Sequence, residues 1–110
     1  MSADEWKPSP EVDAAIRRWM TAQGLAVNST RYYGDEEVYA WRHEASGGAP
    51  TLWIARTVLE AYDAATLAAA LDRLEVAGRM RANPKARFLV VEEDGRILVT
   101  PWSHGPHTGG

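Results

Sequence analysis

The sequence contains no cysteine, and this absence removes several kinds of chemistry at once. Disulfide bonds, thiolate nucleophiles and cysteine-ligated metal centres are all excluded. No apolar run approaches the roughly 18 residues that a membrane-spanning helix needs. The first residues, 1–8, are polar and acidic and lack the apolar segment of a secretory signal. We therefore expect a cytoplasmic protein that does not associate with membranes.

Lysine is also scarce, and the formal net charge is −3 at pH 7, which does not favour general binding to nucleic acids or acidic membranes. Of the 110 residues, 45% are hydrophobic and 25% are charged, a composition typical of one globular domain with a single core. We expect this domain to span residues 9–102. A flexible arm at 1–8 would precede it, and a flexible tail at 103–110 would follow it.

The most informative stretch is residues 51–56, which reads as a strand that leads directly into a helix. It is rich in β-branched and aromatic residues, and alternation places Leu52 and Ile54 on one face and Trp53 on the other. Thr57 follows, with a glutamate three positions later. This spacing predicts a capping box, in which the threonine side chain caps the start of the helix.

Two helices longer than two turns are predicted from apolar spacing and from residues suited to helix ends. The first, residues 10–23, has Ser9 as its cap, proline at its first position and Gly24 as a left-handed end. The second lies within residues 58–81 and would be about 36 Å long if continuous, at about 1.5 Å per residue. That length is unusual for so small a domain. We therefore expect a break at Asp63, whose side chain can cap a new helix.

Five strands are expected, at residues 25–33, 37–44, 51–56, 86–92 and 96–102. Turn sequences, Gly34 with Asp35 and Asp94 with Gly95, separate the first strand from the second and the fourth from the fifth. The element order is α-β-β-β-α-β-β, so the predicted fold class is α+β. The economical packing of these elements is a single, mostly antiparallel sheet with two helices on one face.

Candidate catalytic residues lack the partners that their chemistry needs. Ser46 lies beside two glycines, but no Gly-x-Ser-x-Gly, Ser-x-x-Lys or glycine-rich phosphate loop is present. His43 stands at the end of a strand, and His104 and His107 belong to the polar tail. We therefore predict a protein that is not an enzyme and that needs no metal and no cofactor.

The order of one helix, three strands, a helix and a strand resembles the core of restriction-endonuclease-like nucleases. Their chemistry needs an aspartate and a Glu-x-Lys on neighbouring strands to hold magnesium, and the strand at 51–56 has neither acid nor lysine. The acidic clusters at 35–37 and 92–94 lie at hairpin turns, where solvated carboxylates are expected. The order also resembles double-stranded-RNA-binding domains, but an acidic helix start at 57–63 replaces their lysine cluster. We therefore predict neither activity from these resemblances.

One basic patch gathers around the end of the second helix and consists of Arg79, Arg81, Lys85 and Arg87. Cations at that position stabilise the negative end of the helix dipole. The same side chains could contact an anion or a nucleic acid. This gives one alternative function, a nucleic-acid-associated accessory domain.

Aromatic residues are concentrated in the first three strands, and strand alternation cannot bury all of them under two helices. We expect Trp53 to lie on the open face of the sheet. Whichever of Tyr33, Tyr39 and Trp41 the register allows would share this face with it. An exposed aromatic patch on a sheet is commonly an interface, so these residues form the predicted partner-binding surface.

Features near the two ends of the chain add two further possibilities. Trp6 or Trp102 would cover the open face if either folds back onto it. Gly109 and Gly110 resemble the end of ubiquitin-like modifiers, a likeness that implies an activated C-terminus. The leading hypothesis is a small non-enzymatic module that binds another protein or itself, and a ubiquitin-like modifier joins the nucleic-acid-associated domain as an alternative.

Overall fold

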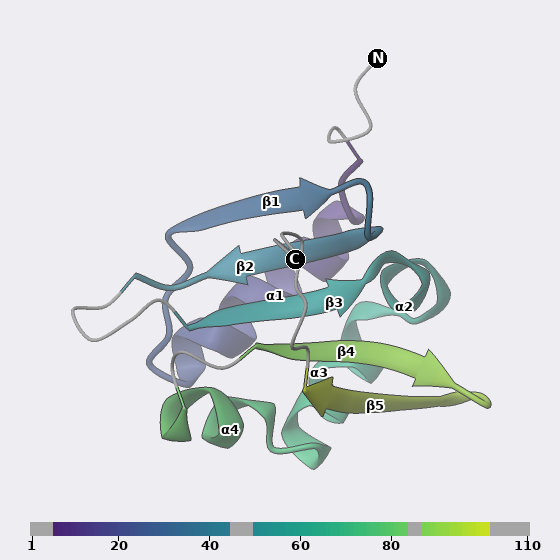
Figure 1. Cartoon of the computed structure of the whole chain (residues 1–110). Coiled ribbons are helices and arrows are strands. Elements are labelled where there is room, and N and C mark those ends of the chain that lie inside the picture. The colour runs from purple at the N-terminus through teal and green to yellow at the C-terminus, as the bar shows by residue number, and fades with distance from the viewer. Residues whose placement is uncertain (1–5, 45–49, 84–86, 102–110) are drawn as a thin grey trace, which may run out of the picture.

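The computed structural model describes residues 6–44, 50–83 and 87–101, and Figure 1 shows how the elements are arranged. Within these ranges the helices are α1 (Pro10–Ala22), α2 (Arg56–Ala61), α3 (Ala64–Arg73) and α4 (Val76–Ala82). The strands are β1 (Ser29–Tyr33), β2 (Val38–Arg42), β3 (Thr51–Ala55), β4 (Phe88–Glu93) and β5 (Arg96–Pro101). The tail expected at 103–110 lies outside the described residues.

The strands form one sheet in the order β1-β2-β3-β4-β5. Neighbouring strands are antiparallel except for β3 and β4, which run parallel. A parallel pair needs a long crossover connection, and the helices α2, α3 and α4 provide it between these two strands. The fold is therefore of the α+β class that the sequence predicts, with a mostly antiparallel sheet.

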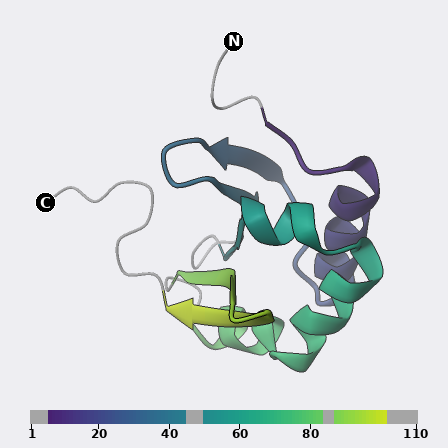
Figure 2. The same ribbon diagram turned by 90° about the vertical axis from the view of Figure 1, so that its right-hand side faces the viewer.

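The helices lie against one face of the sheet, as Figure 2 shows in a view along the strands. All four helices contribute buried side chains to the same apolar cluster, together with side chains that alternate toward them from the strands. We call this side of the sheet the inner face and the opposite side the outer face. None of the helices in the described ranges combines the length and the apolar character needed to cross a lipid bilayer.

The second predicted helix is divided into three shorter ones. The first break lies at Asp63, as expected, because its side chain accepts a hydrogen bond from the Thr66 amide at 2.8 Å and caps α3. A further break lies at Glu75, whose φ of 54° is in the left-handed region. Among the described helices only α1 and α3, with 13 and 10 residues, exceed two turns, which confirms that prediction.

Both predicted ends of α1 are present. The Ser9 hydroxyl accepts a hydrogen bond from the Val12 amide at 3.2 Å, with proline at the first helical position. At the other end Gly24 has a φ of 79°, and the amide of Leu25 donates to the carbonyl of Met20 at 2.8 Å. This pattern is a Schellman motif, which satisfies carbonyls that the helix itself leaves unpaired.

The capping box expected at Thr57 is not formed, so that prediction was wrong. The helix α2 begins at Arg56, and its N-cap is Ala55, which has no side chain able to accept a hydrogen bond. Because β3 leads into the helix without a break, Thr57 already stands inside the first turn. The carboxylate of Glu60 pairs instead with Arg56, at 3.1 Å and one helical turn away.

Trp6 is half-buried and Pro8 is buried, although both belong to the loose arm that we expected at 1–8, and residues 1–5 of that arm lie outside the described residues. The ring of Trp6 lies 5.3 Å from that of Tyr32, and the guanidinium of Arg56 lies 4.9 Å above the Trp6 ring. These contacts belong to the inner face. Trp6 therefore does not cover the outer face.

Two buried tryptophans tie the inner face together through their polar atoms. Trp41 Nε1 donates to Oδ1 of Asp13 at 3.0 Å, which joins β2 to α1. Trp19 Nε1 donates to Oδ1 of Asp72 at 2.8 Å, which joins α1 to α3. An indole N–H that loses water on burial needs such a partner, so these bonds remove a cost that would otherwise oppose packing.

Candidate functional site

The outer face carries a second, smaller apolar cluster, which we call the outer cluster. It consists of Val38, Ala40 and Trp53, with Tyr33 and Leu89 packed against it. Leu52 and Ile54 belong to the main cluster on the inner face. The structure therefore confirms that Trp53 lies on the opposite face of β3 from these two residues.

The register of the strands explains why the residues of the outer cluster meet. Ala40 pairs with Trp53 across β2 and β3, and Trp53 pairs with Leu89 across β3 and β4. The ring of Tyr33 lies 5.2 Å from that of Trp53. The guanidinium of Arg31 lies 4.8 Å above the Tyr33 ring, within the range of a cation–π contact. The cluster thus extends from β1 to β4 and has a cation at its β1 end.

Most of the Trp53 side chain is shielded in the monomer, since the residue is only 7% exposed. Tyr33 and Leu89 are half-buried, and so are Val91 and Leu98, which strand alternation places on the same face. We call these four half-buried residues the outer rim. They supply the accessible apolar atoms of the outer face, whereas Trp53 supports them from within the sheet.

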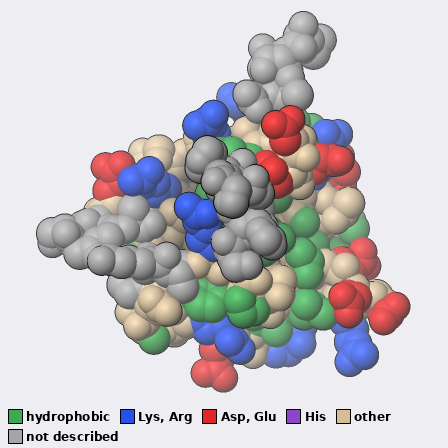
Figure 3. All heavy atoms as spheres, viewed as in Figure 1, with side chains coloured by type: hydrophobic (Ala, Val, Ile, Leu, Met, Phe, Trp, Pro, Cys, Tyr) green, Lys and Arg blue, Asp and Glu red, His purple; other side chains and the backbone are tan. Residues whose placement is uncertain are grey.

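Charge is unevenly distributed around the outer rim. The exposed acidic residues 35–37 and 93–94 occupy the β1–β2 and β4–β5 turns, which lie at the same end of the sheet in Figure 1. Figure 3 shows acidic side chains gathered along this edge of the molecule. Exposed Arg42 lies at the opposite end of β2, with its Nε 3.8 Å from Oε2 of Glu44, and exposed Arg31 lies in the middle of β1. The outer rim therefore has an acidic end at the two turns, and its arginines lie away from that end on β1 and β2.

Tyr39 and Trp41, which we considered for the partner-binding surface, do not lie on the outer face. Because side chains alternate along β2, the outward position of Ala40 turns both of its neighbours inward. Trp41 is fully buried and Tyr39 is 5% exposed, with their rings 4.9 Å apart in the inner core. Of the four aromatic residues proposed from the sequence, the structure leaves Trp53 and Tyr33 on the outer face.

The basic patch at the end of α4 is largely engaged in structural contacts. Arg81 Nη1 donates to the carbonyl of the α1 C-cap at 2.7 Å. Arg79 Nε donates to the carbonyl of the α3 C-cap at 3.2 Å. These bonds match the role of cations near helix C-termini. Arg87 is exposed but also has an interaction partner, and Lys85 lies outside the described residues.

Of the polar residues weighed as catalytic or metal-binding, the structure describes His43 and the two acidic clusters. Nδ1 of His43 lies 2.7 Å from the carbonyl oxygen of Ala26, and because a carbonyl only accepts, this nitrogen carries the proton. Ser46, His104 and His107 lie outside the described residues, as does the terminal glycine pair. In the part of the chain that the structure describes, no three histidine, aspartate or glutamate side chains come together as metal ligands.

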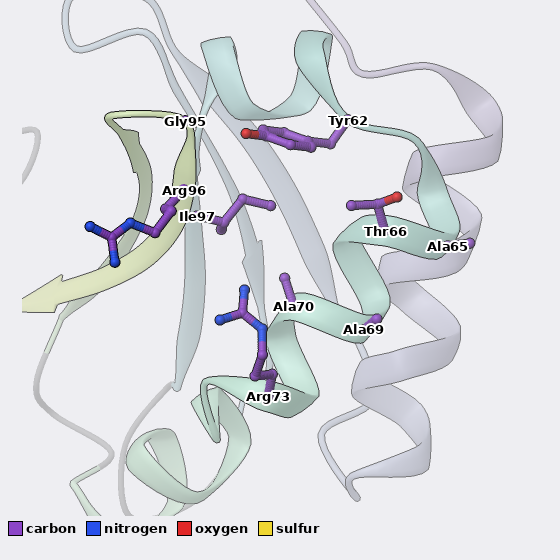
Figure 4. A pocket seen from close by; sticks show the side chains of 9 residues that line it. All are labelled: Tyr62, Ala65, Thr66, Ala69, Ala70, Arg73, Gly95, Arg96 and Ile97. Carbon is purple, nitrogen blue, oxygen red and sulfur yellow. The ribbon is translucent and has the colours of Figure 1, made fainter.

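A groove that the sequence did not indicate lies between α3 and β5 and has a volume of about 560 Å³. Figure 4 shows Tyr62 and Thr66 toward one end, Arg73 farther along α3, and Ile97 directed from β5 toward the helix. The Tyr62 hydroxyl donates to Oε2 of Glu92 at 2.9 Å, and this hydrogen bond raises the pKa of Tyr62 above its ordinary value. Residues from α3, from β5 and from the connections that precede them meet here, so no local sequence pattern marks the groove.

The outer face is the candidate site that the geometry supports best. It has an apolar rim, a buried tryptophan beneath it, acidic turns at one end, and arginines on β1 and β2 away from that end. The inner face, by contrast, is closed by the helices. No protein-family model matches the chain, and neither a curated protein nor a solved structure shows significant similarity to it.

Proposed function

We propose that the protein is a small, non-enzymatic interaction module that self-associates through the outer face of its sheet. The observation that carries this proposal is the outer rim, formed by Tyr33, Leu89, Val91 and Leu98, against which none of the described helices packs. Accessible apolar side chains that are bordered by charged residues are typical of protein-binding surfaces.

A second copy of the chain is the partner that the charges favour. In a two-fold symmetric dimer both subunits present the same patch, so its two ends are exchanged across the axis. If the axis lies in the interface and perpendicular to the strands, the acidic β1–β2 turn at 35–37 of one copy faces Arg42, at the far end of β2, in the other. Complementary charges of this kind orient the partners and increase their rate of association.

Trp53 has a supporting role in this proposal. Its low exposure of 7% leaves little of the indole for a partner to bury. Its ring contact with Tyr33, at 5.2 Å, instead fixes the position of a side chain that is accessible. Contacts across the interface therefore come mainly from the outer rim.

Sedimentation velocity over a range of protein concentrations tests the proposal, with Val91→Lys as the disrupting variant. Val91 is half-buried on the outer face, so a lysine there would lose water on dimerisation without gaining a partner. Ala22→Lys is the matched control, because Ala22 is exposed at the end of α1. We expect wild type and Ala22→Lys to form dimers at concentrations where Val91→Lys remains a monomer with a similar melting temperature.

Two results would contradict self-association through this face. One is a wild-type protein that stays monomeric at the highest concentration attainable. The other is a dimer whose dissociation constant is the same with and without Val91→Lys. Raising the ionic strength adds an independent check, because screening should weaken a dimer in which acidic and basic ends face each other.

A further inference from the structure

A second surface, separate from the outer rim, is the groove between α3 and β5. One of its walls is a helix and the other is a strand (Figure 4). The helical wall presents the small side chains of Ala69 and Ala70, and the strand presents Ile97. Because alanine side chains occupy little space, they leave room between α3 and β5, and Ile97 adds an apolar side chain to a lining that also includes polar residues.

The strand wall has an unpaired edge. β5 is the last strand in the sheet order, so only its β4 side is paired with a described strand. Such an edge presents a row of backbone N–H and C=O groups that can pair with another extended chain. The groove therefore offers backbone hydrogen bonds as well as apolar contacts.

The turn between β4 and β5 determines which backbone groups reach this edge. Asp94 and Gly95 have φ values of 52° and 76°, and they form a two-residue turn whose flanking residues pair with each other. That pair exchanges both of its hydrogen bonds, so the bonding direction alternates along β5 from there. The N–H and C=O groups of Ile97 and Val99 consequently point away from β4 and toward the open edge.

Arg73 gives the groove a preference for negative charge. It is the last residue of α3, it is exposed, and Figure 4 shows its guanidinium in the groove between α3 and β5. Within the described ranges this guanidinium takes part in no ion pair or side-chain hydrogen bond. Arg96, at the margin of the groove, extends away from α3 in the same view. Among the side chains of a polypeptide, a carboxylate is the group that can bind an unpaired guanidinium through two parallel charged hydrogen bonds.

We propose that this groove binds an extended acidic segment of another protein. The segment would add to the sheet as a strand beside β5 and hydrogen-bond the backbone of Ile97 and Val99. Alternate side chains of the segment would pack toward the alanines of α3, and one carboxylate would lie against Arg73. This mode of recognition takes affinity from backbone hydrogen bonds and specificity from the side chains that alternate into the groove.

A display library of random peptides of about seven residues, long enough for a typical strand, provides the probe. We expect selection on the purified protein to enrich peptides with β-branched residues and with aspartate or glutamate at one fixed position. A synthetic copy of the most enriched peptide is then titrated by fluorescence anisotropy. Methylation of its alternate backbone amides removes hydrogen bonds to β5 but keeps the side chains, and should weaken binding about tenfold or more.

Two protein variants locate the binding site. Arg73→Glu reverses the charge in the groove and should weaken binding of the selected peptide about tenfold or more. Arg18→Glu is the matched control, because Arg18 is an exposed arginine of α1 that does not line the groove. We expect it to bind the peptide like wild type, and both variants to melt close to wild type.

The proposal is overturned if no peptide is enriched, or if the enriched peptides bind Arg73→Glu as tightly as wild type. If methylation of the peptide amides does not weaken binding, the peptide does not pair with β5, and the proposal is overturned as well. Hydrogen exchange at the Ile97 and Val99 amides can also be followed without peptide. If these amides become more protected as the protein concentration rises, the edge of β5 pairs with a second copy of the chain, and the proposal is overturned. Arg73 lies outside the outer rim, so self-association and peptide binding can fail separately.

Discussion

The two faces of the sheet are built from the same strands but are closed in different ways. On the inner face Trp41 is fully buried under the helices, and Asp13 accepts its indole N–H at 3.0 Å. On the outer face Trp53 is 7% exposed and contacts Tyr33 within a cluster of strand residues. The comparison shows that one residue type anchors a core on one side and supports an accessible surface on the other.

The largest loss of stability is expected from Trp41→Ala, on the inner face. The substitution removes a fully buried side chain and leaves Asp13 without its indole donor. We expect a loss of about 3–5 kcal/mol in the free energy of unfolding, typical of tryptophan truncation in a core. Urea denaturation followed by circular dichroism measures it, and a loss below that of Trp53→Ala would reverse the ranking of the two faces.

A smaller loss is expected on the outer face, from Trp53→Ala. The outer cluster has only three buried residues, so water can enter the space that the indole leaves, and about 2 kcal/mol should be lost. Because Tyr33 also loses its ring contact, the dimer should weaken in sedimentation experiments. Equal losses for the two tryptophan variants would show that both faces are closed equally well.

The smallest loss of stability is expected from Asp63→Ala. This substitution removes the cap of α3, one of the helices on the inner face, and leaves the outer cluster intact. The hydrogen bond from the Thr66 amide lowers the pKa of Asp63 below its ordinary value. Its stabilisation is therefore present above the unfolded pKa of about 3.9 and disappears as the pH falls through the lower folded value.

Thermal unfolding across a pH series measures this effect. At neutral pH the Asp63→Ala variant should melt at a lower temperature than wild type. The difference should shrink as the pH falls below about 4, where the wild-type carboxyl becomes protonated in both states. If the difference in melting temperature stays constant as the pH falls below about 4, the charge of Asp63 does not stabilise the helix, and the prediction is wrong.

The sequence predicted the features that depend on neighbouring residues. Ser9, Gly24 and Asp63 mark helix ends because their hydrogen bonds or backbone angles involve residues at most five positions away. The side of the sheet on which Trp53 lies followed from alternation along one strand. These signals depend on nearby residues, and at these positions the packing of the chain agrees with them.

Two local predictions failed or were incomplete where the packing of the elements overrode them. The helix after β3 begins at Arg56 rather than after Thr57, because the strand continues directly into it. The break at Glu75 has no glycine, asparagine or proline to announce it, although its φ of 54° is unusual for a glutamate. Both positions lie where the chain bends between packed elements.

The sequence by itself therefore determined the order of strands and helical segments, both ends of α1, the start of α3 and the face of β3 on which Trp53 lies. Only the tertiary structure decided that Tyr39 and Trp41 turn toward the helices, since this depends on how β2 is placed in the sheet. It also decided the bond from Trp19 to Asp72, 53 positions away, and the groove between α3 and the edge of β5. Contacts between distant segments form through the packing of whole helices and strands, and no short sequence pattern records them.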